Sequence, residues 1–173
     1  MLTEQFLDTI LFLLVSIAAV NDLATRRIPN FLLLTGLACA LLLRALSAEP
    51  GASLLSAIGG MGVGLAMFLP FYMVRGMAAG DVKMMAVVGA FCGPNEALQI
   101  AVLTWCAGGV MALVLVLLRG RLQQALGNIG RLVSGAISPK ALAATAASPS
   151  SGSLPYGLAI AIGTVMVLVR HYG

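Results

Sequence analysis

Two carboxylates stand apart from the other acidic residues of this sequence, because each lies beside long apolar runs and close to cations. Asp22 follows the first apolar run and precedes Arg26 and Arg27, whereas Asp81 lies in the stretch 76–83, GMAAGDVK, between two further runs. An ionisable group at the edge of a membrane-grade segment is a functional candidate. The other four of the six acidic residues have ordinary structural interpretations near the N-terminus or in predicted turns: Glu4, Asp8, Glu49 and Glu96.

Paired carboxylates can activate water. Two carboxylates brought together in a poorly solvated site cannot easily both ionise, so one keeps its proton while the other acts as a base. The base takes a proton from the attacking water, and the protonated partner stabilises the oxyanion formed from a peptide carbonyl, as in aspartic proteases. Gly80 is expected to let the backbone bend beside Asp81 where a peptide strand approaches. On spacing alone, the alternative for Asp22 and Asp81 is an interfacial cap at a helix end.

The sequence offers no competing catalytic set. His171 is the only histidine and stands near the end of the chain, where it is expected to be incidental. The three cysteines, Cys39, Cys92 and Cys106, lie singly inside apolar runs, which indicates neither a zinc site nor a disulfide framework and predicts small buried hydrophobic side chains. We therefore expect no cofactor and no metal.

The composition is that of an integral membrane protein. Of the 173 residues, 60% are hydrophobic and 9% are charged, and the mean hydropathy is +1.03. The runs lack the alternation of a β-barrel, so we predict an all-α, polytopic helical bundle that forms a single domain over residues 1–173. About six membrane helices are expected, at 6–20, 31–46, 52–74, 82–92, 97–118 and 154–169. The run 82–92 is short for a complete span.

The connecting segments also carry predictions. A linker is expected at 21–30, with Asn30 as the N-cap of the second helix. An outer turn is expected around Arg44, Glu49, Pro50 and Gly51. Gly60 and Gly64 have the four-residue spacing that lets membrane helices approach closely. Within the connecting segment 119–153, apolar residues at helical spacing predict an amphipathic helix on the membrane surface, with a plain polar loop as the alternative.

The distribution of cations predicts the orientation in the membrane. With the N-terminus outside, a six-span count leaves only Arg44 and Arg170 on the outer side. The cytoplasmic cations are then Arg26, Arg27, Arg75, Lys83, Arg119, Arg121, Arg131 and Lys140. Asp22 and Asp81 both fall at the cytoplasmic face. The net charge of +4 is explained by this rule, so nucleic acid is not an expected partner.

Three ordered motifs resemble the type IV prepilin peptidase family. They are Asp22 followed by Arg27-Ile28-Pro29-Asn30, then Gly80-Asp81-Val82-Lys83, then Pro155-Tyr156-Gly157 with Ala159, Ile160 and Gly163. The resemblance covers nearly the whole chain. It implies a bacterial inner-membrane aspartic endopeptidase that removes the basic leader of pilin precursors, cutting after a Gly just before their hydrophobic segment. It also implies that Asp22 and Asp81 are catalytic, with Arg27, Pro29, Asn30, Gly80 and Lys83 as motif or substrate-binding residues.

The sequence departs from the family pattern in two respects. The signature Gly-x-Gly-Asp begins here with Ala78, and we expect activity to survive this small change. Nothing resembles the Cys-x-x-Cys region of the longer members, which is associated with methylation of the new pilin N-terminus. The chain is therefore similar to the short, peptidase-only branch that serves Flp-type pili, and no methylation is expected.

Substrate binding and two rival functions stay open at this stage. The substrate's apolar segment is expected between helices, while Arg26, Arg27, Arg75 and Lys83 either contact lipid head groups or an acidic residue of the pilin, or only determine topology. One rival is a proton-coupled transporter with Asp22 and Asp81 as relay groups. The other is a non-catalytic subunit of a pilus or secretion assembly. The oligomeric state is not predicted.

Overall fold

The computed structural model describes residues 2–73, 76–118 and 155–172, and within these ranges the chain is helical without any strand. The predicted all-α class is confirmed. The chain divides into two compact units, residues 1–107 with 155–173, and residues 108–154. The helices are α1 (Leu2–Thr25), α2 (Asn30–Ala45), α3 (Pro50–Met73), α4 (Ala79–Cys92), α5 (Pro94–Leu118) and α8 (Tyr156–Tyr172). The predicted interfacial helix at 119–153 and Arg75 lie outside the described residues.

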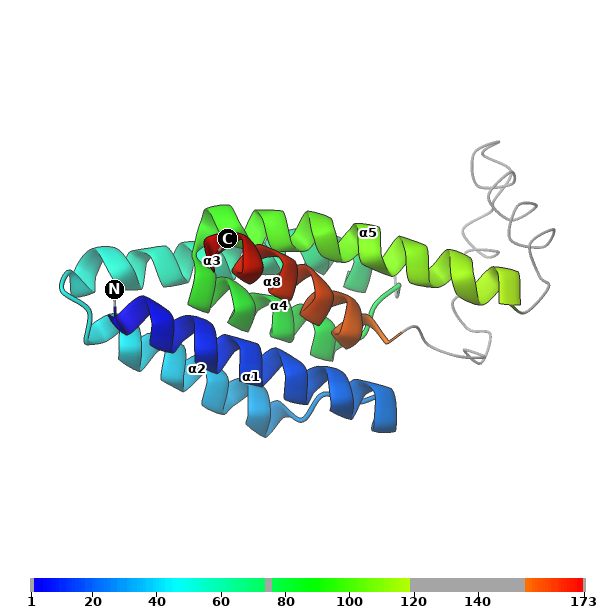
Figure 1. The fold of residues 1–173 in the computed structure, drawn as a ribbon, viewed down its shortest axis with the longest axis horizontal. Coiled ribbons are helices and arrows are strands. Elements are labelled where there is room, and N and C mark those ends of the chain that lie inside the picture. Colours follow the sequence, from blue (N-terminus) through cyan, green and yellow to red (C-terminus); the bar gives the residue numbers. More distant parts are fainter. Residues whose placement is uncertain (1, 74–75, 119–154, 173) are drawn as a thin grey trace. The chain divides into compact units, whose positions relative to one another are not determined.

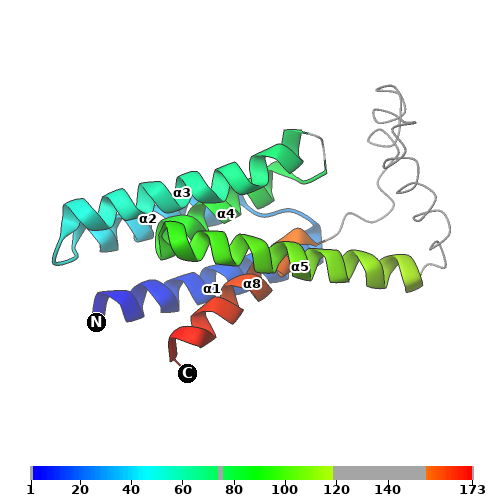
Figure 2. The same cartoon turned by 90° about the horizontal axis from the view of Figure 1, so that it is seen from above.

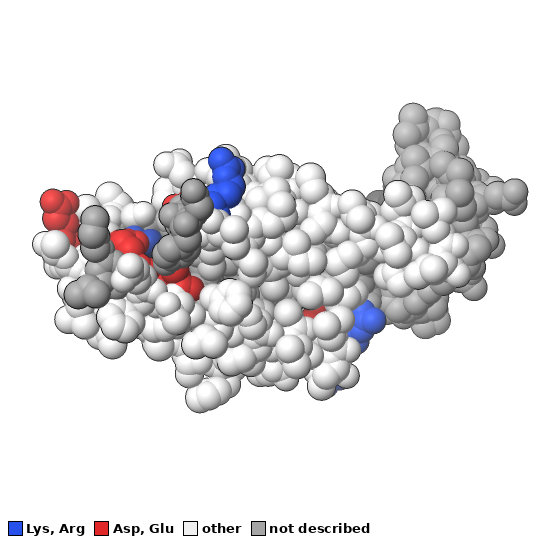
Figure 3. Space-filling view, in the orientation of Figure 1, with Lys and Arg blue, Asp and Glu red and all other residues white. Residues whose placement is uncertain are grey.

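Three helices are long and apolar enough to cross a membrane: Thr3–Thr25, Pro50–Met73 and Pro94–Leu118. A helix of 24 residues, such as α3, extends about 36 Å, which exceeds the roughly 30 Å of a bilayer core. Asn30–Ala45 and Tyr156–Arg170 are shorter apolar helices. On the face shown in Figure 3, charged side chains form two groups separated by uncharged surface. The lengths of the apolar helices and the uncharged surface between the two groups together identify a membrane protein.

The bundle has one end that carries both candidate carboxylates. In Figure 1, α1 finishes at the end where α2, α4 and α8 begin. We call this end, defined by Asp22 on α1 and Asp81 on α4, the aspartate end. The sequence produces it because successive apolar runs joined by short connections form antiparallel neighbours. Asp22 and Asp81, distant in sequence, therefore reach the same end of the molecule.

The short helix α4 lies inside the bundle. It packs against α1, α2, α3 and α8, as Figures 1 and 2 show from two directions. From Asp81 to Phe91 every residue except Lys83 is buried. Its 14 residues extend only about 21 Å, less than the bilayer core. The helix that begins with Asp81 is thus held by protein on nearly every face.

Small residues allow α3 and α4 to approach closely, as the spacing of Gly60 and Gly64 predicts. A Cβ atom at Gly60 would overlap the carbonyl oxygen of Gly89, and a Cβ atom at Gly64 would lie 2.5 Å from the carbonyl oxygen of Met85. The pairing of Gly60 with Gly89 and of Gly64 with Met85 shows that the helices are antiparallel. Backbone-to-backbone packing of this kind replaces the hydrophobic driving force that is missing between helices in lipid. The prediction of close approach is confirmed.

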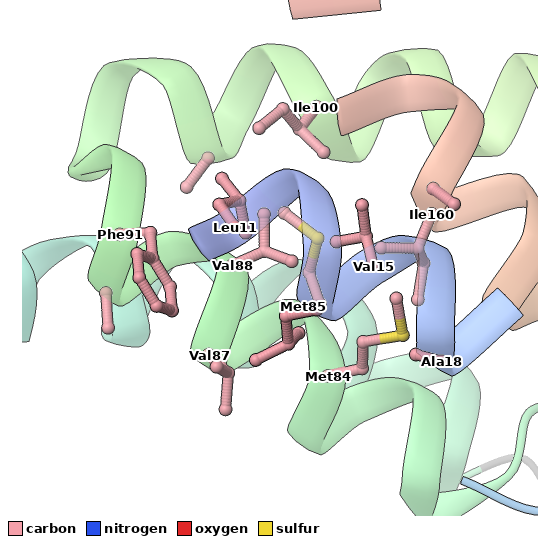
Figure 4. Close-up of a cluster of buried hydrophobic side chains, with 14 of the residues drawn as sticks. Leu11, Val15, Ala18, Met84, Met85, Val87, Val88, Phe91, Ile100 and Ile160 are labelled. Carbon is pink, nitrogen blue, oxygen red and sulfur yellow. The ribbon is translucent and has the colours of Figure 1, made fainter. Parts of the chain in front are cut away.

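The hydrophobic core joins α4 to α1, α5 and α8 (Figure 4). Met84, Met85 and Val88 of α4 are fully buried, and Leu11 of α1 and Ile160 of α8 lie against the same cluster. Methionine fills irregular gaps because its side chain is unbranched and flexible. The adjacent side chains fix the rotation of α4 about its axis, and with it the direction of Asp81.

Arg44 differs from its predicted place in an outer turn. It lies in the last turn of α2 and is only 7% exposed. Its Nε donates to the carbonyl of Ala90 at 3.0 Å, and its Nη2 donates to the carbonyl of Phe91. The last carbonyls of a helix have no partner within the helix, and leaving them unpaired in an apolar environment is costly. Arg44 therefore anchors the end of α4 that lies opposite Asp81.

Two further predictions are wrong. Cys39 and Cys106 are exposed and Cys92 is only partly buried, because a membrane helix can present an apolar thiol to lipid without burying it in protein. The predicted turn residue Pro50 instead begins α3, and Pro94 begins α5 in the same way. Proline suits the first helical position, where its missing N–H has no partner to lose. The proline that indicated a turn marks the start of a helix instead.

Candidate active site

The last turn of α1 carries Asp22. The predicted linker at 21–30 is wrong in its first half, because the helix continues to Thr25. The polar residues there bond back to their own helix: the Thr25 hydroxyl donates to the carbonyl of Asn21 at 2.9 Å, and the Asn21 amide donates to that of Ile17 at 3.0 Å. Arg26 closes the helix with a φ of 56° and donates its N–H to the carbonyl of Asp22. Asp22 is consequently held on a helix, and it is 7% exposed.

Asp81 lies in the first turn of α4 and is 6% exposed. The residue before the helix, Ala78, has φ −78° and ψ 150°, and its carbonyl accepts the Asp81 N–H at 3.2 Å. This extended conformation is open to any residue, so alanine fits where the family signature has glycine. Gly80 does not bend the chain as expected: it is helical, and a Cβ atom there would meet Ile28 at an ordinary 3.6 Å.

Burial changes the acidity of Asp81, which lies outside the three helices long enough to cross a membrane. Loss of solvent raises its pKa from 3.8 to about 7, and the negative charge of Asp22 adds to the rise, against a backbone hydrogen bond from Ala78 that lowers it. The charge of Asp22 acts on Asp81 because the two carboxylates share one poorly solvated region. Near neutral pH, Asp81 is therefore divided between its protonated and ionised forms.

Gly157, in the first turn of α8, completes the site. Its backbone N–H donates to Oδ2 of Asp22 at 2.8 Å. A Cβ atom at this position would lie 2.9 Å from both Cβ and Oδ2 of Asp22, so only glycine lets α8 come this close. The free N–H groups and dipole at a helix start favour a negative charge. Gly157 holds the Asp22 carboxylate in place.

Our sequence reasoning did not select Gly157 as a site residue, although a signal was present. It belongs to the third motif, Pro155-Tyr156-Gly157. The role of its N–H depends on α8 packing against α1, and no local pattern reveals that contact.

The second half of the linker touches the start of α4. Lys83 Nζ donates to Oδ1 of Asn30 at 3.2 Å, and Ile28 lies against Gly80. Asn30 is not the N-cap as predicted: Pro29 holds that position without a side-chain bond, and Asn30 is the first residue of α2. Its amide is thereby free to accept from Lys83 instead of from its own backbone. Arg27 and Pro29 are exposed in the connection.

These contacts bring all three motifs to the aspartate end. A scan against protein families matches residues 9–113 to the Type IV leader peptidase family. The chain belongs to the type IV leader peptidase family. The matched range contains Asp22 and Asp81 and ends before Gly157. No curated protein and no solved structure matches the chain.

As a leader peptidase, the chain needs groups that activate water and polarise a peptide carbonyl. Asp22, Asp81 and the Gly157 N–H supply one fixed carboxylate, one carboxyl that is partly protonated near neutral pH, and one donor. In the described ranges, no three His, Cys, Asp or Glu side chains gather as metal ligands. The set has the composition for acid–base hydrolysis.

Proposed function

We propose that this leader peptidase removes the leader peptide of type IV prepilins of the Flp type at the cytoplasmic membrane face, with Asp22 and Asp81 activating the hydrolytic water. The observation that carries the proposal is the pair of buried aspartates, 7% and 6% exposed, whose interaction contributes to a pKa of about 7 for Asp81. The resemblance of the three motifs supports the prepilin substrate.

The two carboxylates have different environments and so different roles. Asp22, fixed by the Gly157 N–H, is the base and takes a proton as water attacks the scissile carbonyl carbon. Protonated Asp81 donates its proton to the carbonyl oxygen, which yields a neutral gem-diol. As the C–N bond breaks, Asp22 returns its proton to the leaving nitrogen and Asp81 recovers a proton from a hydroxyl of the intermediate. The pair ends in its starting state.

The positive-inside rule supports a cytoplasmic site. Arg26, Arg27 and Lys83 are exposed at the aspartate end. Short connections rich in Lys and Arg remain on the cytoplasmic side of the membrane. A precursor inserted with its leader in the cytoplasm would then present its cleavage site at the level of Asp22 and Asp81.

Co-expression with candidate Flp-type prepilins tests the proposal. Precursor size is followed for the wild type, Asp22→Asn and Asp81→Asn, and membrane insertion is measured for each. Asp8→Asn is the matched control, because it makes the same change on α1 well before Asp22. We expect the wild type and the control to shorten the precursor, while the two site variants insert but leave it intact.

Other outcomes would be equally informative. Cleavage by inserted Asp22→Asn or Asp81→Asn would show that the catalytic assignment is wrong. If the wild type cleaves no candidate precursor, the proposal fails. A role as a proton-coupled transporter or a non-catalytic subunit would then account better for the buried pair.

A further inference from the structure

An apolar groove of about 530 Å³ lies beside the start of α4. Its walls come from α2 and α4, with one side chain from α3, and only two of its residues are polar. The lining residues are Asn30, Phe31, Leu33, Leu34, Leu37, Met61, Lys83, Ala86 and Val87. The volume falls in the range of clefts that bind small molecules or a few side chains of a partner.

The groove opens at the aspartate end. Asn30 is the first residue of α2 and Lys83 is in the second turn of α4, so both polar residues mark this end of the groove. From Asn30 to Leu37 the groove follows about 10 Å of α2, or two helical turns. The hydrogen bond between Lys83 and Asn30 joins the two walls at this end and leaves the apolar part of the groove unfilled.

The groove and Asp81 lie on different faces of one helix. Residues two apart on a helix do not share a face, so Lys83 points to the groove while Asp81 points toward α1 and α8. A helix with its side chains is about 10 Å across. An extended chain advances about 3.3 Å per residue, so roughly three or four residues would connect the groove, over the start of α4, to Asp81.

We propose that this groove holds the first two turns of the substrate's apolar segment, an inference that rests on the proposed prepilin peptidase function. The occupant enters the membrane from the aspartate end, parallel to α2 and α4, and its apolar face contacts the leucines of α2. The few residues before that segment cross the start of α4 and present the scissile bond to Asp22 and Asp81. Lys83, with three N–H donors and one bond to Asn30, also binds a carbonyl or carboxylate oxygen of the substrate.

The position of the groove next to the aspartate end favours a peptide over a lipid as its occupant. An acyl chain would fill the same apolar volume, but it has no need of a groove that opens within a few residues of the carboxylates. A substrate cut just before its apolar segment needs the groove and the two carboxylates to lie only a few residues apart. Continuity between groove and active site therefore points to the substrate.

Site-specific photo-crosslinking in membranes tests the inference. A benzoylphenylalanine probe replaces Leu34, which lines the groove, or Leu42, which lies two turns further along α2 and does not. The two leucines are 66% and 60% exposed, so the probes are equally accessible. The Asp81→Asn background retains uncut precursor. We expect the precursor to be captured from position 34 and not from position 42.

Cleavage kinetics provide the second readout. Leu34→Trp fills the groove, and we expect the KM for precursor to rise about tenfold or more with little change in kcat, while Leu42→Trp matches the wild type. Equal capture at both positions, capture of phospholipid alone at position 34, or an unchanged KM would overturn the inference while wild-type cleavage leaves the proposed function standing. If the wild type cleaves no precursor, both the function and this inference fall.

Discussion

The contact between Gly157 and Asp22 gives the sharpest prediction. In Gly157→Ala, the new methyl group would lie 2.9 Å from Cβ and Oδ2 of Asp22 and 3.1 Å from its Cγ. Carbon atoms do not pack that closely, so either α8 or the carboxylate must shift. In both cases the hydrogen bond from the Gly157 N–H, 2.8 Å long, is weakened or lost.

The size of the effect follows from the nature of this bond. A hydrogen bond to a charged group contributes about 1.5–3 kcal/mol. If Asp22 relies on it to stay oriented in the transition state, kcat/KM for leader cleavage should fall roughly 10- to 100-fold, since each 1.4 kcal/mol is about tenfold in rate. The shift that the methyl group forces also costs stability, so activity is compared per folded, inserted molecule.

Single-turnover cleavage of a prepilin in membranes measures the effect, with Gly163→Ala as the matched control. Gly163 is also on α8, and a Cβ atom there would lie 2.7 Å from the Thr104 hydroxyl, so the control crowds the same helix away from Asp22. We expect Gly163→Ala to keep most of its activity per inserted molecule. Activity of Gly157→Ala within about threefold of the wild type, or an equal loss in both variants, would refute the reasoning.

Four further predictions concern acidity and packing. The folded pKa of Asp81, about 7, exceeds its unfolded value of 3.8, so the free energy of unfolding should fall as pH rises from about 4 to 8, by up to roughly 4 kcal/mol. Thermal unfolding in detergent measures this fall, and Asp81→Asn should abolish it. Leader cleavage by the wild type should decline above about pH 7 for the same reason, as Asp81 loses its proton, which a pH–rate profile would show. Gly60→Ala should destabilise by about 3 kcal/mol or more because its methyl group meets the α4 backbone, whereas Gly62→Ala, with open space around it, should change Tm little or raise it. Arg44→Met should cost about 1–3 kcal/mol for each carbonyl left unpaired, while exposed Arg170→Met should stay within about 0.5 kcal/mol in the same unfolding assay.

Much of the architecture was predictable because hydropathy reports it directly. Long apolar runs joined by short connections predict antiparallel helices, and this alternation places Asp22 and Asp81 at the same end. The small-residue spacing of Gly60 and Gly64 predicts close packing because only a missing side chain permits it. The catalytic roles of the two aspartates and the side of the membrane on which they lie stay predictions.

The features that sequence reasoning missed depend on partners distant in the chain. Arg44 was assigned to an outer turn because hydropathy treats a charge as exposed, and its true partners are carbonyls of α4, 46 and 47 residues away. Gly157 meets Asp22 across 135 residues. The continuation of α1 through Asp22 was missed because Asn21 and Thr25 signal a turn unless their bonds back to the helix are known.

The position of α4 also bears on how the protein is made. A segment of 14 residues with an acid in its first turn is a poor substrate for independent insertion, since a charged residue is costly in the bilayer and the helix is too short to cross it. It must enter the membrane together with its neighbours and find its place as they assemble around it. Until that step is complete, Asp81 cannot lie beside Asp22. With the proposed catalytic roles of Asp22 and Asp81, a newly synthesised chain would therefore reach the bilayer inactive and acquire activity only on folding.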